Sequence, residues 1–112
     1  MKEIKAVIQP HMLERVLHAL QSLPHFSGAT VSDCRGHGRG GGAGEKPPGE
    51  DLFYLAPKIK LEIFCGDADA EKLVTTIATA ARTGNPGDGI IIVVEAPLVV
   101  RVRTGERQEL AV

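Results

Sequence analysis

The order in which the spacing of hydrophobic residues changes along this 112-residue chain limits its fold more than any other feature. Residues 2–9 alternate between apolar and polar side chains, which predicts a β-strand. Apolar residues then recur at helical spacing over residues 13–23, and Pro10 stands where the first turn of a helix tolerates proline. The sequence therefore predicts a strand followed by a helix.

A second strand and helix are predicted in the other half of the chain. Residues 58–65 alternate cleanly between aliphatic and mostly charged side chains, and residues 73–81 place their apolar side chains on one face of a helix. Asp67 or Asp69 is expected to cap this helix, because a short side-chain oxygen accepts hydrogen bonds from the free N–H groups of a first turn.

Three further segments have the character of extended chain. Residues 29–35 show a weaker alternation. Residues 89–95 are nearly all apolar, a pattern typical of a central strand covered on both faces. Residues 98–106 alternate again, with Arg101 and Arg103 on the face opposite the apolar side chains.

The resulting order is strand, helix, strand, long loop, strand, helix, strand. This order predicts the ferredoxin-like βαββαβ arrangement, an α+β fold in which two helices cover one face of an antiparallel sheet. We expect one domain, residues 1–112, with one core. Because Val7, Phe64 and Val99 are too apolar for free exposure, the other face of the sheet is expected to pack between subunits.

The two cysteines are expected to be reduced and far apart. In a hairpin of the second and third strands, Cys34 lies near Lys58, and Cys65 lies at the far end, beyond the reach of a disulfide. The cysteines also lack the spacing of a metal site.

Composition argues against several classes of function. A net charge of −1 gives no general attraction to nucleic acid, and a chain without tryptophan, with one tyrosine and three phenylalanines, offers no stacking surface. The longest apolar run is broken by Glu95 and Pro97, so no segment is expected to span a bilayer. The first ten residues lack the apolar region of a signal peptide, which favours the cytoplasm.

The histidines do not predict a metal centre. His11 and His18 are two helical turns apart, too far to share one ion, and His25 lies beyond Pro24. The sequence also contains no recognisable arrangement of nucleophile and base. We therefore expect neither a bound metal nor catalysis.

A glycine-rich segment separates the second and third predicted strands. Residues 36–41 satisfy G-x-G-x-x-G, but a dinucleotide site needs a helix directly afterwards, and the following "GAGEKPP" begins none. We therefore expect a flexible loop, with backbone N–H groups near Gly36 and Gly38 as a candidate anion site.

A second glycine cluster occupies residues 82–90, where Gly87-Asp88-Gly89 predicts a tight turn into a strand. Arginines two residues apart, such as Arg101 and Arg103, usually form a solvated surface. Pointing into a cleft between subunits, they would be phosphate ligands.

Several stretches resemble the PII nitrogen-regulatory signalling proteins. "TGNPGDGIIIVVEAPLVVRVRTGE" resembles their C-terminal signature, and "VIQPHMLERVLHAL", "GATVSDCRGHGRG" and "LAPKIKLEIFC" are similar to their first strand and helix, the approach to their T-loop and the strand on which that loop returns. The resemblance covers essentially the whole chain. It implies a homotrimer with adenine-nucleotide sites in the clefts between subunits. It also implies that residues 37–56 form the mobile T-loop, which docks on a target transporter or enzyme.

The resemblance further implies the residues of the nucleotide site. The base and the cleft would be lined by Val7, Thr30, Gly36, His37, Gly38, Arg39, Glu62, Ile63 and Phe64. The backbone of Gly87, Asp88 and Gly89 would approach the ribose and phosphates, and Arg101 and Arg103 would reach them from the neighbouring subunit. Lys58 matches the family lysine that pairs with 2-oxoglutarate.

Three positions depart from the family pattern. Gly40 replaces a glutamine that holds Mg²⁺ and 2-oxoglutarate, which argues against Mg-ATP-dependent sensing of 2-oxoglutarate. Ile90 replaces a phosphate-binding lysine, a loss of about 1–3 kcal/mol of charge-assisted hydrogen bonding, so we expect a shift from ATP towards ADP or AMP. Asp51 replaces the modified tyrosine, and Tyr54 is the nearest hydroxyl.

These departures leave the co-ligand open. A small anion such as bicarbonate is a candidate for the space beside Gly40 and Lys58, and no obligatory cofactor is expected. The alternative function is a trimeric ferredoxin-like metal-tolerance or structural protein without nucleotide sensing. Arg101 and Arg103 argue against it, since such a protein needs no phosphate ligands.

Overall fold

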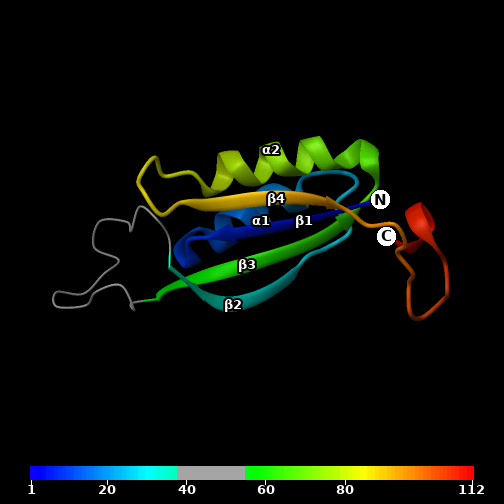
Figure 1. Ribbon diagram of the computed structural model, residues 1–112. Helices are drawn as coiled ribbons and strands as arrows, with labels where there is room; N and C mark the ends of the chain where they lie inside the picture. Colours follow the sequence, from blue (N-terminus) through cyan, green and yellow to red (C-terminus); the bar gives the residue numbers. More distant parts are fainter. Residues whose placement is uncertain (38–54) are drawn as a thin grey trace.

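The computed structural model of the chain describes residues 1–37 and 55–112 (Figure 1). In chain order, its main elements are β1 (Lys2–Ile8), α1 (Leu13–Gln21), β2 (Thr30–Gly36), β3 (Ala56–Cys65), α2 (Ala70–Ala81) and β4 (Gly89–Glu95). Short 3-10 helices lie before α1, before α2 and near Val112, at Pro10–Met12, Asp67–Asp69 and Gln108–Ala111. The order confirms the predicted ferredoxin-like βαββαβ arrangement.

The four strands form one antiparallel sheet in the order β2-β3-β1-β4. Figure 1 shows α1 and α2 on the same face of this sheet, as predicted. The register places Cys34 directly opposite Lys58, whereas Cys65 pairs with Lys2 near the other end of β3. Both cysteines are free thiols, in agreement with their predicted separation.

The core lies between the sheet and the two helices. Its buried side chains come from alternate positions of β1 and β3 and from one stripe of each helix: Ile4, Ala6, Ile8, Leu61, Ile63, Val16, Leu20, Leu73 and Ile77. Burial of an aliphatic side chain stabilises the folded state by about 1.5–3 kcal/mol relative to exposure. The alternation and helical spacing of the sequence therefore identified the faces that hold the fold together.

The other face of the sheet is not covered by a helix. Lys5 and Glu62 lie opposite each other there on β1 and β3, which brings opposite charges together. Around this pair, Phe64, Ile92 and Val94 expose 42%, 51% and 37% of their surface. Exposed apolar side chains gathered on one face are typical of a surface that meets another chain.

The prediction that residues 89–95 form a central strand covered on both faces is wrong. In the sheet of the described residues, β4 pairs with β1 alone and lies at the edge. Ile91 packs partly against the core, whereas Ile90 is 69% exposed. The continuous apolar run therefore has one side on the core and the other on the open face.

Residues 98–106 leave the sheet and do not extend it (Figure 1). A single bridge joins Val100 to Arg107, and the Gly105 N–H donates to the Arg101 carbonyl at 2.8 Å, which closes a turn. The alternation noted in the sequence belongs to this hairpin-like segment. Residues 97–108 are called the C-terminal arm below.

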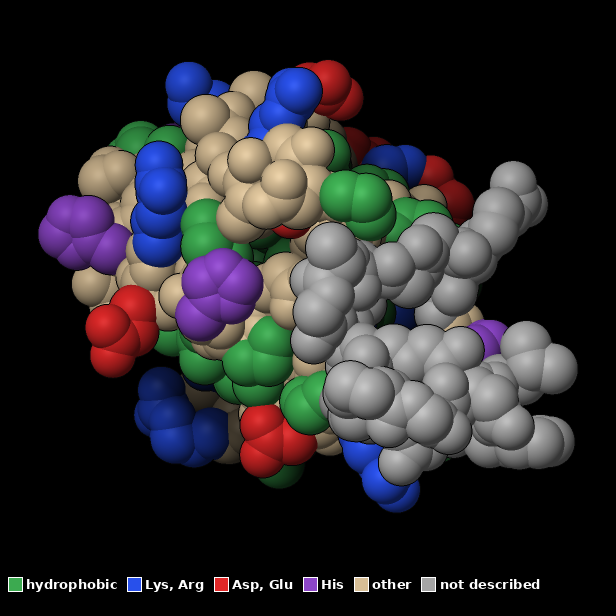
Figure 2. All heavy atoms as spheres, turned by 90° about the vertical axis from the view of Figure 1, so that its left-hand side faces the viewer, with side chains coloured by type: hydrophobic (Ala, Val, Ile, Leu, Met, Phe, Trp, Pro, Cys, Tyr) green, Lys and Arg blue, Asp and Glu red, His purple; other side chains and the backbone are tan. Residues whose placement is uncertain are grey.

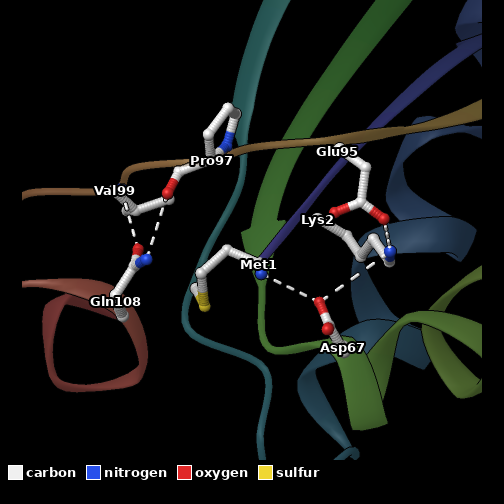
Figure 3. Close-up of polar contacts among 7 residues, drawn as sticks. All are labelled: Met1, Lys2, Asp67, Glu95, Pro97, Val99 and Gln108. Carbon is white, nitrogen blue, oxygen red and sulfur yellow. Dashed lines mark hydrogen bonds and ion pairs between the residues drawn. The ribbon is translucent and has the colours of Figure 1, made fainter.

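Gln108 fixes the C-terminal arm at its base (Figure 3). Its Nε2 donates to the Pro97 carbonyl at 3.1 Å, and its Oε1 accepts from the Val99 N–H at 3.2 Å. Its φ of 57° lies in the left-handed region, which side chains other than glycine rarely adopt. Three residues of the arm are thus joined by one side chain.

Asp67 joins the start of β1 to the segment before α2 (Figure 3). The Met1 ammonium lies 2.9 Å from its carboxylate, and this hydrogen bond holds the pKa of Asp67 below its usual value. Lys2 lies 4.0 Å from Asp67 and also pairs with Glu95. The predicted capping is wrong for both aspartates: among the described residues neither makes a side-chain capping bond, although Asp69 occupies the N-cap position of α2.

Candidate functional site

The turn of residues 82–89, between α2 and β4, is the first place where predicted site residues meet. The Asp88 carboxylate accepts hydrogen bonds from the Thr83 N–H at 2.8 Å, from the Gly84 N–H at 2.9 Å and from the Thr83 hydroxyl. The hydroxyl first, and then the two backbone N–H groups, lower the pKa of Asp88. The side chain of Asp88 is therefore used to shape the turn, which leaves its backbone for a ligand.

The carbonyl of Gly87 fixes the same turn to the sheet. Gln9 Nε2 donates to this oxygen at 2.8 Å, and Lys58 Nζ donates to it at 2.9 Å. The side chain of Lys58 also lies beside the end of β2: a Cβ built on Gly36 would be 3.5 Å from Lys58 Cγ. One side chain thus connects the 82–89 turn with the start of the long loop.

Gly89 packs directly on β1. It has a φ of +118°, and a Cβ at this position would lie 1.8 Å from the Val7 carbonyl oxygen. Only glycine allows this approach. Val7 itself is half-buried, opposite Lys60 and Ile90 in the register.

These residues form the loop-end group, which we define as Val7, Gly36, His37, Lys58, Gly87, Asp88 and Gly89. Figure 2 views the molecule from this end. On the described part of that surface, basic, acidic and histidine side chains are interspersed and do not gather into one patch of a single sign. A long polyanion binds to an extended surface of positive charge, which is not seen on the described part of this end. The mixed surface is better suited to a small ligand that is held by a few groups.

A second group lines a hollow of about 580 Å³ between the sheet and the C-terminal arm. Its predicted site residues are Thr30 on β2, Glu62 and Phe64 on β3, and Arg101 on the arm. These four residues are called the arm-end group. They combine an apolar ring, a carboxylate and a guanidinium at the surface of one hollow, which is the mixed lining that small-molecule sites use.

Two predicted positions lie outside both groups, and five more lie outside the described residues. Ile63 is 1% exposed and points into the core, so only its backbone is near the arm-end group. Arg103 is exposed in the turn of the arm, outside the hollow lining. Gly38, Arg39 and Gly40 lie outside the described residues, as do Asp51 and Tyr54.

The two groups lie at opposite ends of the sheet. Gly36 and Thr30 are the two ends of β2, and six residue steps of a strand span about 20 Å. The hairpin register carries the same separation onto β3, where Ala56 lies opposite Gly36 and Glu62 opposite Thr30. Within one chain, the glycines of the loop-end group therefore lie at one end of the sheet and the hollow at the other, and Val7, opposite Lys60, is the loop-end residue nearest to Glu62.

Sequence reasoning missed Gln9 and Thr83. Thr83 had a weak local signal, because it lies in the same glycine-rich segment as Asp88, and aspartate side chains in turns hydrogen-bond to nearby groups. Gln9 had none, since its partner Gly87 is 78 positions away in the sequence.

Neither a metal site nor a membrane span is found in the described part of the chain. Over residues 1–37 and 55–112, no three or more His, Cys, Asp or Glu side chains come together as a metal site. In the same ranges, no helix has the length and apolar character needed to cross a bilayer.

The fold and the position of the loop define a ferredoxin-like α+β protein with a long insertion between β2 and β3. Comparison with known proteins agrees with this class: the family description "Nitrogen regulatory protein P-II" matches residues 1–106. The chain belongs to the P-II family, whose members are signal-transduction regulators.

Individual relatives cover nearly the whole chain. Nitrogen regulatory protein P-II 2 of Methanothermobacter thermautotrophicus is 44% identical, over 100% of this chain and 97% of its own length. Nitrogen regulatory protein P-II of Rhizobium meliloti is 41% identical, over 95% of both chains. The Pasteurella multocida protein of the same name is 38% identical over the full length of both. These matches do not favour the alternative of a metal-tolerance or structural protein.

Proposed function

We propose that this P-II family protein is a cytoplasmic homotrimer that binds an adenine nucleotide between subunits and regulates a partner protein according to the nucleotide bound. The observation that carries the proposal is the separation of the predicted ligand residues into a loop-end group and an arm-end group. Each group is half of a site. A cyclic assembly brings the loop end of one copy against the arm end of the next, so every site is completed by two chains.

The chemistry of the two halves is complementary. The loop-end group supplies the backbone of Gly87, Asp88 and Gly89, and such glycine-rich turns present N–H groups to anions. The arm-end group supplies the guanidinium of Arg101, for which no hydrogen bond or ion pair is found among the described residues, together with an apolar ring for a base. Arg103, exposed nearby on the arm, is a second guanidinium for the phosphates.

The open face of the sheet supports assembly. Exposed Phe64, Ile92 and Val94 lie beside the opposite charges of Lys5 and Glu62. Burying this surface against a second copy removes apolar area from water, and the neighbouring Lys5 and Glu62 enter the interface with opposite charges.

The preferred nucleotide follows from Ile90. This side chain is 69% exposed directly after Gly89, at the position where the family has a phosphate-binding lysine. Without that cation, the third phosphate of ATP gains less than it loses in hydration. We therefore propose ADP or AMP as the preferred ligand, with binding that does not depend on Mg²⁺.

The co-ligand and the partner form the remaining part of the proposal. Because Gly40 lacks the glutamine side chain, 2-oxoglutarate is replaced by a smaller anion, for which bicarbonate is the candidate and Lys58 the cationic ligand. The long loop between β2 and β3 presents the state of the site to a membrane transporter or a metabolic enzyme, which places the protein at the membrane when that partner is a transporter. The protein itself is a regulator and not an enzyme.

Complementation between two defective chains tests the shared site. Arg101→Ala removes the arm-end guanidinium, and Asp88→Ala removes the carboxylate that shapes the loop-end turn. Each variant alone should bind ADP at least about tenfold more weakly. Trimers that contain both variants can be isolated with two different affinity tags. In these trimers the intact loop-end group of an Arg101→Ala chain can meet the intact arm-end group of an Asp88→Ala chain, so some sites should bind ADP as the wild type does. Mixed trimers that bind no better than the parents would contradict a site shared between chains.

A further inference from the structure

Gln9 holds the peptide group that faces the proposed phosphate site. Its Nε2 donates to the Gly87 carbonyl oxygen at 2.8 Å from the residue directly after β1. Lys58 Nζ donates to the same oxygen at 2.9 Å from β3, so two strands hold one carbonyl. Gly87 has a φ of +93°, which glycine adopts about as readily as a negative φ, so the direction of this peptide group depends on the two donors.

Fixing the Gly87 carbonyl also fixes the direction of the next N–H. The described chain contains no cis peptide bond, and in a trans peptide the N–H points opposite to the C=O. Because Gln9 and Lys58 draw the carbonyl towards the sheet, the N–H of Asp88 is turned away from them. A backbone N–H held in this direction is a donor for an anion outside the turn.

Gln9 and Lys58 differ in how strongly a bound anion competes with the Gly87 carbonyl for their hydrogen bonds. Lys58 carries a positive charge that any bound anion attracts, whereas the Gln9 amide is neutral and keeps its proton at every physiological pH. When an anion draws Lys58 away from Gly87, Gln9 is the donor that still holds the turn.

We infer that Gln9 is a positioning residue for the nucleotide: through the Gly87 carbonyl it aims the Asp88 N–H at the phosphates. The inference rests on the proposed function for the identity of the ligand. It does not require Gln9 to touch the nucleotide.

Two variants separate positioning from packing. Gln9→Met keeps the length of the side chain but removes the donor, and Gln9→Lys restores a donor. Calorimetric titration should show ADP binding to Gln9→Met about three- to tenfold more weakly than to the wild type, as expected for one lost hydrogen bond. Gln9→Lys should bind ADP more tightly than Gln9→Met but more weakly than the wild type, because the phosphates compete with the Gly87 carbonyl for its charged donor. Adenosine, which lacks phosphates, should bind the two variants and the wild type alike. An equal loss for adenosine and ADP, or no loss for either, would overturn the inference.

Hydrogen exchange separates a failure of this inference from a failure of the proposed function. In protein without nucleotide, the amides of residues 83–89 should exchange faster in Gln9→Met than in the wild type or Gln9→Lys. If the wild type binds no adenine nucleotide, the proposed function is wrong, and this exchange pattern still decides whether Gln9 fixes the turn. Unchanged exchange in Gln9→Met would show that the Gly87 carbonyl does not need Gln9.

Discussion

Gly89 lies so close to Val7 that a Cβ built on Gly89 would be 1.8 Å from the Val7 carbonyl oxygen. This approach sets the position at which the 82–89 turn enters β4, and with it the place of Gly87 and Asp88 relative to β1. The arrangement of the loop-end group therefore requires glycine at position 89.

Replacing Gly89 by alanine should destabilise the protein strongly. Gly28 is the matched control, because its φ of +121° is nearly that of Gly89 (+118°) but a Cβ there meets nothing within 4 Å. In urea unfolding, Gly28→Ala should lose about 1–3 kcal/mol from backbone strain, and Gly89→Ala about 2 kcal/mol more, because backbone must also move. Equal losses would show that the contact with Val7 relaxes at no cost.

Asp88→Asn should make the free energy of unfolding change less with pH in the acid range. Folding lowers the pKa of Asp88 below its ordinary value of 3.8. The ionised carboxylate therefore stabilises the folded state above that value, and this contribution disappears as the pH falls through the lowered pKa. Urea midpoints measured from about pH 7 to about pH 2 should show Asp88→Asn less stable at neutral pH, with the difference shrinking as the pH falls below about 4. Asp33→Asn, on exposed β2, is the control, and a difference that is constant with pH would contradict the assignment.

Gln108→Met should loosen the C-terminal arm and weaken nucleotide binding. The substitution removes the bonds to Pro97 and Val99 that fix the arm carrying Arg101. We expect about three- to tenfold weaker ADP binding, with faster exchange of the Val99 amide. Gln21→Met, at the exposed end of α1, should change neither. Unaltered affinity and exchange in Gln108→Met would mean that the arm is held by other contacts.

Arg103→Ala should weaken ADP binding about ten- to hundredfold and leave the trimer intact, because a charge-assisted bond to phosphate is lost. Titration calorimetry and sedimentation measure the two properties on the same samples. Arg15→Ala, on the exposed side of α1, controls for the loss of a surface charge. Dissociation of the Arg103→Ala trimer would identify this arginine as an interface residue first.

The sequence predicted the parts of the fold that depend on local spacing. Alternation identified the buried faces of β1 and β3, and hairpin geometry predicted Cys34 opposite Lys58, because both follow from the two-residue period of a strand. β4 was misplaced for a physical reason. An apolar run shows that both sides avoid water but not whether a helix or another surface covers them.

Side-chain partners distant in sequence could not be predicted in the same way. Asp67 was expected to cap a helix, but folding brings the Met1 ammonium within 2.9 Å, and a full charge is a stronger partner than a backbone N–H. Gln9 and Gly87 likewise meet only in the folded sheet. Of the candidate site, the sequence indicated the residues, whereas their division between two ends of the sheet required the strand register.

Calorimetric titration of the wild-type protein with ADP, AMP and ATP, each with and without Mg²⁺, 2-oxoglutarate or bicarbonate, measures whether the protein binds adenine nucleotide and which one it prefers. We predict that ADP or AMP binds at one molecule per chain, at least as tightly as ATP, without a requirement for Mg²⁺ or 2-oxoglutarate. Absence of binding by every adenine nucleotide would show that the protein is not a nucleotide sensor, and tight 2-oxoglutarate binding that requires Mg-ATP would contradict the roles given to Gly40 and Ile90.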